Sequence, residues 1–365
     1  MRAAAGWTGK PEKIAMGSTR TNNFDALRAI AALMVFVSHS FALSSGTILT
    51  DPISRISRQQ TDAGSIAVSV FFIISGYLIT MSFTRSRSIL SFVMNRALRI
   101  LPALAAVLLV LAFVAGPLLS VEPIGAYFGS SEPYRFFLVN LSLYDARFYL
   151  PGVFLHNPWP RGVDGSLWTL NHEVACYALV LVLGILGLLN KYVTAALYLA
   201  GLVALKMWFG GDRAELGTFF LAGAVLYHWR PPLHRGLAWA CLALWVAALL
   251  TGGFRPATAT VGAYLVIYLA LSPTVRLPNL ARWGDLSYGT YIWAFPVEQL
   301  AAQLLGHHVT PLGIALLSTP VTLGLALLSW HFIEAPALAL KRRWSYPEVV
   351  IAGSAIDVQV GARSP

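Results

Sequence analysis

The stretch FDALRAIAALMVFVSH, residues 24–39, is apolar enough to enter a membrane and yet carries two ionisable side chains, Arg28 and His39. An ionisable side chain placed in the hydrocarbon costs about 3 kcal/mol or more on insertion scales, so such residues are usually kept for a function. The stretch therefore predicts a membrane-spanning helix with a functional site built into it.

The composition of the whole chain extends this prediction to the rest of the protein. Of its 365 residues, 57% are hydrophobic and only 12% are charged, whereas soluble globular domains have about 25% charged residues. Apolar runs of roughly 17 to 25 residues, the length that crosses about 30 Å of hydrocarbon, recur along the chain. We predict an all-α polytopic membrane protein with about ten transmembrane helices, at residues 25–46, 65–84, 99–120, 168–189, 192–209, 214–229, 236–252, 257–272, 286–305 and 312–334.

The positions of Lys and Arg between these helices predict the orientation, because positive charge is retained on the cytoplasmic side. Alternate connections divide these residues into a set of 17 and a set of 7, and the larger set includes both ends of the chain. Both termini are therefore expected in the cytoplasm, as an N-terminal tail (1–22) and a C-terminal tail (341–365). The net charge of +10 is then a topology signal, and no nucleic-acid partner is expected.

One connection on the external side is much longer than the others. Residues 121–167 contain several prolines and aromatic residues, and a loop of this length is usually functional or disordered. The aromatic residues favour an ordered segment at the membrane surface, with a short interfacial or re-entrant helix at 135–141. The alternative is a covering loop without a role in substrate binding.

His39 is the first candidate for chemistry. It lies eleven residues after Arg28, which places it about 16 Å deeper in the membrane at 1.5 Å per residue. A neutral imidazole is the base that is easiest to bury in a membrane. The alternative is a structural histidine that bonds to a backbone carbonyl of a neighbouring helix.

Glu173 is the second intramembrane candidate, in GSLWTLNHEVACY at 165–177. The predicted helix of Glu173 enters from outside and that of His39 from inside, so both residues can reach the same level. A histidine and a glutamate in a dry cavity form a base and its orienting or charge-balancing partner. We therefore predict His39 and Glu173 as the catalytic pair. The alternative for Glu173 is a carboxylate favoured by the dipole of a helix start.

Two arginines just before the third predicted helix form a candidate anion site. Arg96 and Arg99 are three residues apart and share a helix face, and guanidinium groups suit phosphate. The alternative is that both arginines only mark the cytoplasmic side of the membrane.

Two further residue types give smaller predictions. At the cytoplasmic end of the last helix, Glu334 is electrostatically unfavourable and is expected to pair with an arginine. Because Cys176 and Cys241 both fall in apolar helices, we expect no disulfide and no metal site.

Taken together and in order, these motifs resemble the acyltransferase 3 family of membrane-bound acyltransferases, which includes bacterial polysaccharide O-acetyltransferases. The resemblance covers residues 22–336. Its motifs are Arg28 with ten residues before His39, FFIISGYLI at 71–79, Arg96-x-x-Arg99, GSLWTL at 165–170 followed by Glu173, SYGTY at 287–291, and Glu334-x-Pro336.

The resemblance implies an O-acyltransferase, of the class that moves groups other than amino-acyl groups, in the bacterial inner membrane. Its donor substrate would be acetyl-CoA or another acyl-CoA, and its acceptor a hydroxyl of a cell-surface or lipid-linked carbohydrate or of a small molecule. In that family the position of His39 is taken as catalytic, Arg28 belongs with it, and Arg96 and Arg99 are linked to donor binding. Residues 23–340 would form the transmembrane domain, surrounded by membrane lipids, and a homodimer is left open.

The chain departs from the family pattern in two places. Many members have histidine where this chain has Ala294, so no catalytic role is carried to that position. Some members continue into a soluble hydrolase-like domain, whereas this sequence stops shortly after its last predicted helix. We therefore expect the membrane part to complete the transfer.

A rival interpretation is a multi-pass transporter or flippase in which His39 and Glu173 form a proton relay. It predicts substrate movement without covalent change. A basic pocket that opens from the cytoplasm onto His39 favours the enzyme, whereas a polar passage past His39 to both faces favours the transporter. A third interpretation, an assembly scaffold, leaves the intramembrane charges unexplained.

Overall fold

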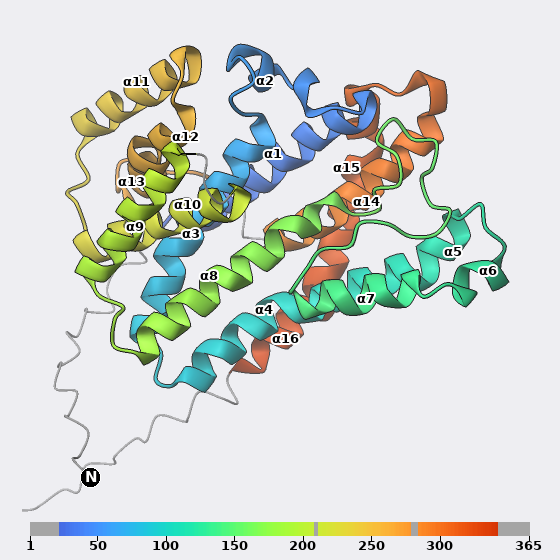
Figure 1. The fold of residues 1–365 in the computed structure, drawn as a ribbon, viewed down its shortest axis with the longest axis horizontal. Coiled ribbons are helices and arrows are strands. Elements are labelled where there is room, and N and C mark those ends of the chain that lie inside the picture. The colour runs from blue at the N-terminus through green and yellow to red at the C-terminus, as the bar shows by residue number, and fades with distance from the viewer. Residues whose placement is uncertain (1–21, 208–210, 279–283, 342–365) are drawn as a thin grey trace, which may run out of the picture.

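The computed structural model describes residues 22–207, 211–278 and 284–341. Within them every regular element is a helix, and Figure 1 shows the helices as a bundle. The longest elements are α1 (Phe24–Ser45), α3 (Ala63–Arg85), α4 (Ile89–Val110), α8 (Trp168–Ile185), α9 (Lys191–Lys206), α10 (Gly211–Trp229), α11 (Arg235–Thr251), α14 (Ser287–Leu305) and α15 (Pro311–Ser329). The predicted all-α fold is confirmed, while the two predicted tails fall almost wholly outside the described residues.

Three of the helices contain a π-helical turn and then continue as α-helices. The helix α4 passes through a π-helical turn, Leu111–Ala115, into α5 (Gly116–Leu119). Likewise, α12 (Phe254–Ala257) leads through Thr258–Gly262 into α13 (Ala263–Leu271), and α15 leads through Trp330–Glu334 into α16 (Ala335–Ala339).

Six helical segments among the described residues are long and apolar enough to cross a membrane. They are Phe24–Ser45, Ala63–Arg85, Ile89–Leu119, Gly165–Ile185, Phe254–Leu271 and Pro311–Ala339. Each of the ten ranges predicted from the sequence overlaps a helix. A multi-pass protein is therefore supported, while ten spans with both ends in the cytoplasm stay a prediction.

The start of α4 corrects the sequence interpretation. The third helix was expected from residue 99, but it begins at Ile89, where Ser88 caps it by accepting a hydrogen bond from the backbone N–H of Ser91 at 3.1 Å. Hydropathy missed these first turns because they carry polar and basic side chains. Arg96 and Arg99 consequently lie inside α4 and not before it.

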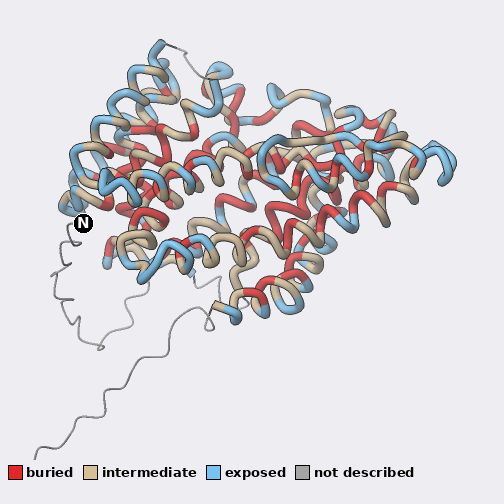
Figure 2. The backbone as a smooth tube through the Cα atoms, turned by 60° about the horizontal axis from the view of Figure 1, so that its bottom comes forward, coloured by how far each residue is buried: buried red, intermediate tan, exposed pale blue. Residues whose placement is uncertain are grey.

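The helix α3 lies at the centre of the bundle and packs against α1, α8, α10 and α13. Its contact with α10 is very close, because a Cβ added at Gly76 would lie 1.8 Å from the carbonyl oxygen of Phe220. The helix α1 packs on its other sides against α14 and α15. Figure 2 shows that the buried residues gather in the interior of the bundle.

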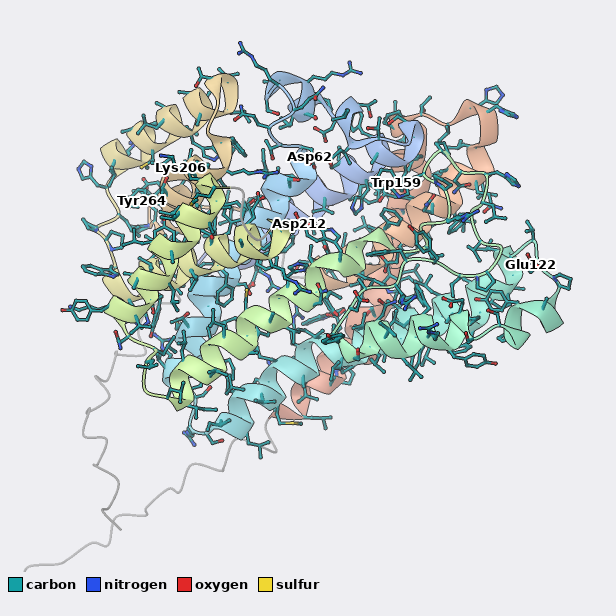
Figure 3. The ribbon with its side chains drawn as sticks, viewed as in Figure 1. Asp62, Glu122, Trp159, Lys206, Asp212 and Tyr264 are labelled. Carbon is teal, nitrogen blue, oxygen red and sulfur yellow. The ribbon has the colours of Figure 1, made fainter. Side chains whose placement is uncertain are left out.

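The long segment at 121–167, predicted to lie on the external side, is partly helical. It contains α6 (Ile124–Gly129) and α7 (Glu132–Ser142), and α7 packs against α4. A helix therefore covers residues 135–141, while its place at the membrane surface stays a prediction. The buried Tyr127 donates a hydrogen bond to the carbonyl of Ala112 at 2.8 Å. In Figure 3, Glu122 marks the end of this segment near α5 and α6, whereas Trp159 lies near α14.

A buried amide fixes the last part of this segment to α14. The side-chain nitrogen of Gln299 donates to the carbonyls of Trp159 at 2.9 Å and Gly162 at 2.6 Å. Asn157 in turn donates to the side-chain oxygen of Gln299 at 2.7 Å. The segment is therefore held over the end of α14 by specific hydrogen bonds.

Candidate active site

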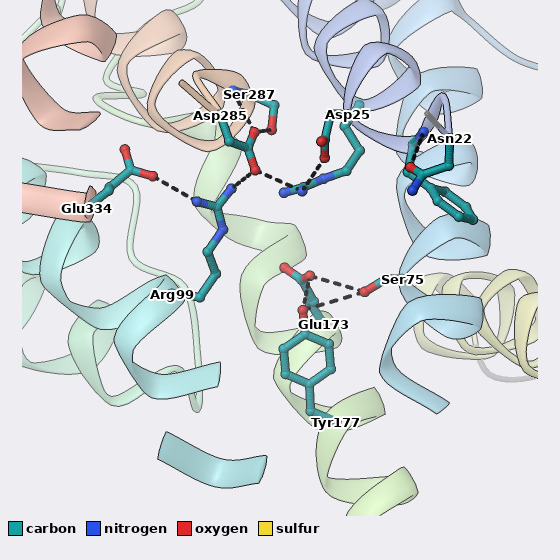
Figure 4. A network of polar contacts seen from close by, with 11 residues as sticks. Asn22, Asp25, Ser75, Arg99, Glu173, Tyr177, Asp285, Ser287 and Glu334 are labelled. Carbon is teal, nitrogen blue, oxygen red and sulfur yellow. Dashed lines mark hydrogen bonds and ion pairs between the residues drawn. The ribbon is translucent and has the colours of Figure 1, made fainter. Parts of the chain in front are cut away.

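A network of ion pairs joins four parts of the fold (Figure 4). One carboxylate oxygen of Asp285, in the connection before α14, lies 2.9 Å from Nη1 of Arg28 and 2.5 Å from Nη2 of Arg99. The other end of the Arg99 guanidinium lies 3.2 Å from the buried Glu334. The prediction that Glu334 pairs with an arginine is confirmed.

The two arginines keep Asp285 ionised. Burial alone would raise the pKa of this carboxyl, but Arg28, Arg99 and the hydrogen bonds from Ser287 outweigh that effect and lower its pKa to about 2. The hydroxyl of Ser287 donates to Asp285 at 2.6 Å. Asp285 therefore stays negative at physiological pH and neutralises part of the charge of both arginines.

A cavity of about 310 Å³ opens beside this network, between α1, α3, α4, α8 and α14. Its described lining carries four basic and two acidic side chains, and so an excess of positive charge. They are Arg28, Arg96, Arg99, Lys341, Glu173 and Asp285. The three arginines predicted to bind the donor are thus brought together around one cavity.

Arg96 differs from the other two arginines. Its buried Nε has no hydrogen-bond partner, and within the described residues it forms no ion pair with a carboxylate. An unsatisfied buried guanidinium nitrogen is costly. Arg96 is therefore the arginine of this cavity with capacity left for an anion.

Glu173 lies in the second turn of α8 and faces the same cavity. Its carboxylate accepts hydrogen bonds from the hydroxyls of Tyr177 and of Ser75, the latter at 3.3 Å (Figure 4). The structure thus places Glu173 with the arginines.

His39 contacts a different carboxylate from the one expected. Its Nδ1 lies 3.5 Å from Oε2 of Glu298, a fully buried residue of α14. The ring of Phe295 packs edge-on against the imidazole, with centroids 5.1 Å apart. Because α1 packs against α14, the structure places Glu298 beside His39, and no contact between His39 and Glu173 occurs among the described residues.

Glu298 is the residue that the sequence interpretation missed. It lies inside the ninth predicted helix, 286–305, which is otherwise largely apolar. The rule that singled out Glu173, an acid inside a membrane helix, applies equally to Glu298 and could have found it.

The cavity and His39 are close but separate. The lining of the cavity includes Phe71, Thr169 and Tyr291, and His39 does not belong to its described lining. The Tyr291 hydroxyl lies 2.6 Å from that of Thr169. Phe295, which contacts His39, follows Tyr291 by one helical turn, about 6 Å along the helix axis.

Asp164 is buried at the start of the segment that leads into α8. One carboxyl oxygen accepts a hydrogen bond from the backbone N–H of Ser166 at 2.9 Å, and the other has no partner. Burial raises the pKa of Asp164 to about 8, against the lowering effect of the bonds to Ser166. The carboxyl is therefore mainly protonated at pH 7.

Replacing Asp164 with asparagine is expected to preserve the fold and to change how the stability of the protein depends on pH. The pKa of Asp164 in the fold, about 8, exceeds the ordinary value of 3.8, so the folded protein holds a proton that the unfolded chain has lost. Stability of the wild type then falls as pH rises between these values. Asparagine caps a helix as well as aspartate does but does not titrate.

Thermal unfolding in detergent between pH 6 and 9 measures this effect. The midpoint of the Asp164→Asn variant should rise relative to the wild type up to pH of about 8 and then level off. Asp164→Ala, which removes both the cap and the titrating group, should be about 1 kcal/mol less stable than Asp164→Asn at every pH. Parallel wild-type and Asn curves would contradict the raised pKa.

The chain is similar to known proteins that are named as acetyltransferases. The chain is 31% identical over 335 residues to an O-acetyl transferase of Shigella phage Sf6, covering 86% of this chain and 95% of that protein. It is 29% identical to Nodulation protein 10 of Rhizobium leguminosarum bv. viciae, over 89% of this chain and 95% of that protein. With its membrane-length helices, the protein is a membrane O-acyltransferase.

The family follows from a match along most of the chain. Residues 21–331 match the family model of the acyltransferase domain, so the chain belongs to the acyltransferase 3 family, as its motifs predicted. It is also 25% identical to the peptidoglycan O-acetyltransferase OatA of Listeria monocytogenes, over 86% of this chain and 55% of that protein. No solved structure matches the chain. These relatives do not favour the transporter interpretation.

Proposed function

We propose that this protein transfers an acetyl group from acetyl-CoA to a hydroxyl of a cell-surface or lipid-linked carbohydrate at the bacterial inner membrane. The observation that carries the proposal is the basic cavity with the unsatisfied Arg96 in its wall. The relatives support the choice of acetyl group, and one of them is named as an acetyltransferase of peptidoglycan, a polysaccharide.

In this proposal the phosphates of coenzyme A bind at the arginine end of the cavity. Arg96 makes the direct contact because Arg28 and Arg99 already share Asp285. These two arginines contribute mainly a positive field, which concentrates an anionic substrate. The volume of about 310 Å³ is at the lower end of the ~300–1,000 Å³ typical of ligand pockets, and it accommodates part of the donor.

Glu173 takes a different role from the one first expected. Its carboxylate faces the cavity and is oriented by Ser75 and Tyr177. The pantetheine arm of coenzyme A carries amide N–H groups, and a fixed carboxylate is a strong acceptor for them. We assign Glu173 to orienting this arm, so that the thioester points toward Tyr291 and Phe295.

His39 then acts as the general base. Its free ring nitrogen removes the proton of the acceptor hydroxyl, the oxygen attacks the thioester carbonyl, and the sulfur of coenzyme A leaves and takes up the proton. A positioned base of this kind contributes about 10²–10⁴-fold. Transient acylation of His39 itself is the alternative route through the same atom.

The acceptor is proposed to approach from the side of the external segment. Trp159 packs against the apolar cluster that contains Phe295 and Leu43, and Gln299 holds its backbone in place. An aromatic side chain here offers a surface for a sugar ring next to His39.

Arg96→Ala tests the donor site. Loss of a hydrogen bond to a charged group costs about 1.5–3 kcal/mol, so the KM for acetyl-CoA should rise by roughly 10- to 150-fold while kcat changes little. Steady-state kinetics with purified protein measure both constants. The matched control is Arg85→Ala, an exposed arginine at the end of α3. An unchanged KM in the Arg96 variant would remove Arg96 from the donor site.

A further inference from the structure

Two buried polar atoms that lack hydrogen bonds face each other across the contact between α1 and α14. They are Nδ1 of His39 and Oε2 of Glu298, 3.5 Å apart. A buried polar atom without a partner is rare in proteins and calls for an explanation. Because the two atoms lie side by side and can carry opposite charges, the explanation must concern the pair.

The rest of Glu298 is firmly held. The side chain is fully buried, and its other oxygen accepts a hydrogen bond from the hydroxyl of Ser40 at 2.7 Å. Within the described residues, its one ion-pair partner is His39. Burying a carboxylate without a strong cationic partner costs several kcal/mol, so packing alone does not account for this residue.

The geometry points to Glu298 as a positioning residue for His39, an inference that rests on the proposed function. The carboxylate faces Nδ1, which favours the tautomer with the proton on that nitrogen and leaves the lone pair on Nε2. The imidazole is 21% exposed although Nδ1 is buried. The other edge of the ring is thus the accessible one, and Nε2 is its nitrogen.

Glu298 acts at the moment when His39 gains charge. When Nε2 takes the hydroxyl proton, the imidazole becomes a cation, and the carboxylate beside Nδ1 stabilises it. The gap of 3.5 Å is longer than a charge-assisted hydrogen bond, and such contacts often tighten only as the reaction proceeds. The proton then passes to the leaving sulfur, so both side chains return to their starting state.

A purely structural role for Glu298 makes a different prediction. If the residue only joins α1 to α14, its replacement lowers thermal stability and weakens donor binding together with turnover. If it positions His39, turnover falls alone. The separation of kcat from KM, beside the unfolding midpoint, therefore distinguishes the two roles.

The test uses Glu298→Gln and Glu298→Asp in the full-length protein with acetyl-CoA as donor. Gln keeps the shape and the bond to Ser40 but not the charge, and its kcat should fall by about 10²-fold, within the ~10²–10⁴-fold that a base supplies. The KM for acetyl-CoA and the unfolding midpoint should not change. Asp keeps the charge and should restore part of the rate. In a His39→Ala background, Glu298→Gln should have no further effect.

Controls keep the outcomes separate. Gln303→Ala, at an exposed position of α14, should behave as the wild type. If both Glu298 variants fail to fold, Ser40→Ala replaces them, since it releases the carboxylate and should lower kcat several-fold at constant KM. An unchanged kcat, or a parallel loss of donor affinity, overturns the inference. A wild-type protein without any transfer activity overturns the proposed function instead.

Discussion

His39→Ala is expected to reduce acetyl transfer by about 10²–10⁴-fold, the full contribution of a positioned general base. Donor binding should remain, because His39 does not belong to the described lining of the basic cavity. Purified protein in detergent, radiolabelled acetyl-CoA and a carbohydrate acceptor give the rate, and binding of the labelled donor without acceptor gives the affinity.

The control for this variant is His307→Ala. His307 is exposed in the short turn after α14, so its removal should leave both rate and donor affinity unchanged. Retained turnover in His39→Ala would contradict the assignment of His39. Loss of donor affinity together with turnover would place His39 in the donor site.

Arg99→Met is expected to have the second-largest effect, on stability as well as on donor binding. It leaves Asp285 and the buried Glu334 without the guanidinium that joins them. Removal of one partner from a buried ion pair costs about 3–5 kcal/mol, and the partial exposure of Asp285 places the expected loss near the lower end. The unfolding midpoint and the yield of monodisperse protein should both fall.

A second substitution separates the two effects. Arg99→Met combined with Glu334→Gln removes the buried charge that the first change leaves unpaired, so it should recover part of the lost stability. Donor affinity should recover less than stability, because the cation removed belongs to the cavity lining, whereas Glu334 does not belong to the described lining. If Arg99→Met alone is as stable as the wild type, the ion network does not hold these elements together.

The helices were largely predictable from the sequence because a membrane requires long apolar runs. The start of α4 was not, because its first turns carry Arg96 and other polar residues that lower the hydropathy. Its signal was local and present: Ser88 is a good N-cap and begins the helix. Capping residues therefore locate a helix start that hydropathy misses.

The pairing of His39 was the least predictable part of the site. The directions of their helices placed Glu173 and His39 at a similar depth in the membrane. The depth of a residue does not show which helices are neighbours. The structure packs α1 against α14, so Glu298 faces His39 instead. The side-by-side arrangement of the helices depends on side-chain packing over the whole bundle, so it cannot be predicted from the pattern of any one stretch of sequence.

The arginines likewise had one feature that the sequence predicts and one that it does not. Their placement on one helix face was readable from their spacing. Their partners were not, because Asp285 and Glu334 lie 186 and 235 residues from Arg99 along the chain. Only the fold shows that Arg99 is already paired, whereas Arg96 forms no ion pair with any carboxylate in the described part of the chain.

The most direct test of the proposed function is the fate of the acetyl group. Purified protein is reconstituted in lipid vesicles, supplied with acetyl-labelled acetyl-CoA and a carbohydrate acceptor, and followed for label and free thiol. Acetyl transfer predicts an alkali-labile ester on the acceptor, formed in equal amount to the thiol released. Substrate that crosses the membrane without any new ester would contradict it and support the transporter.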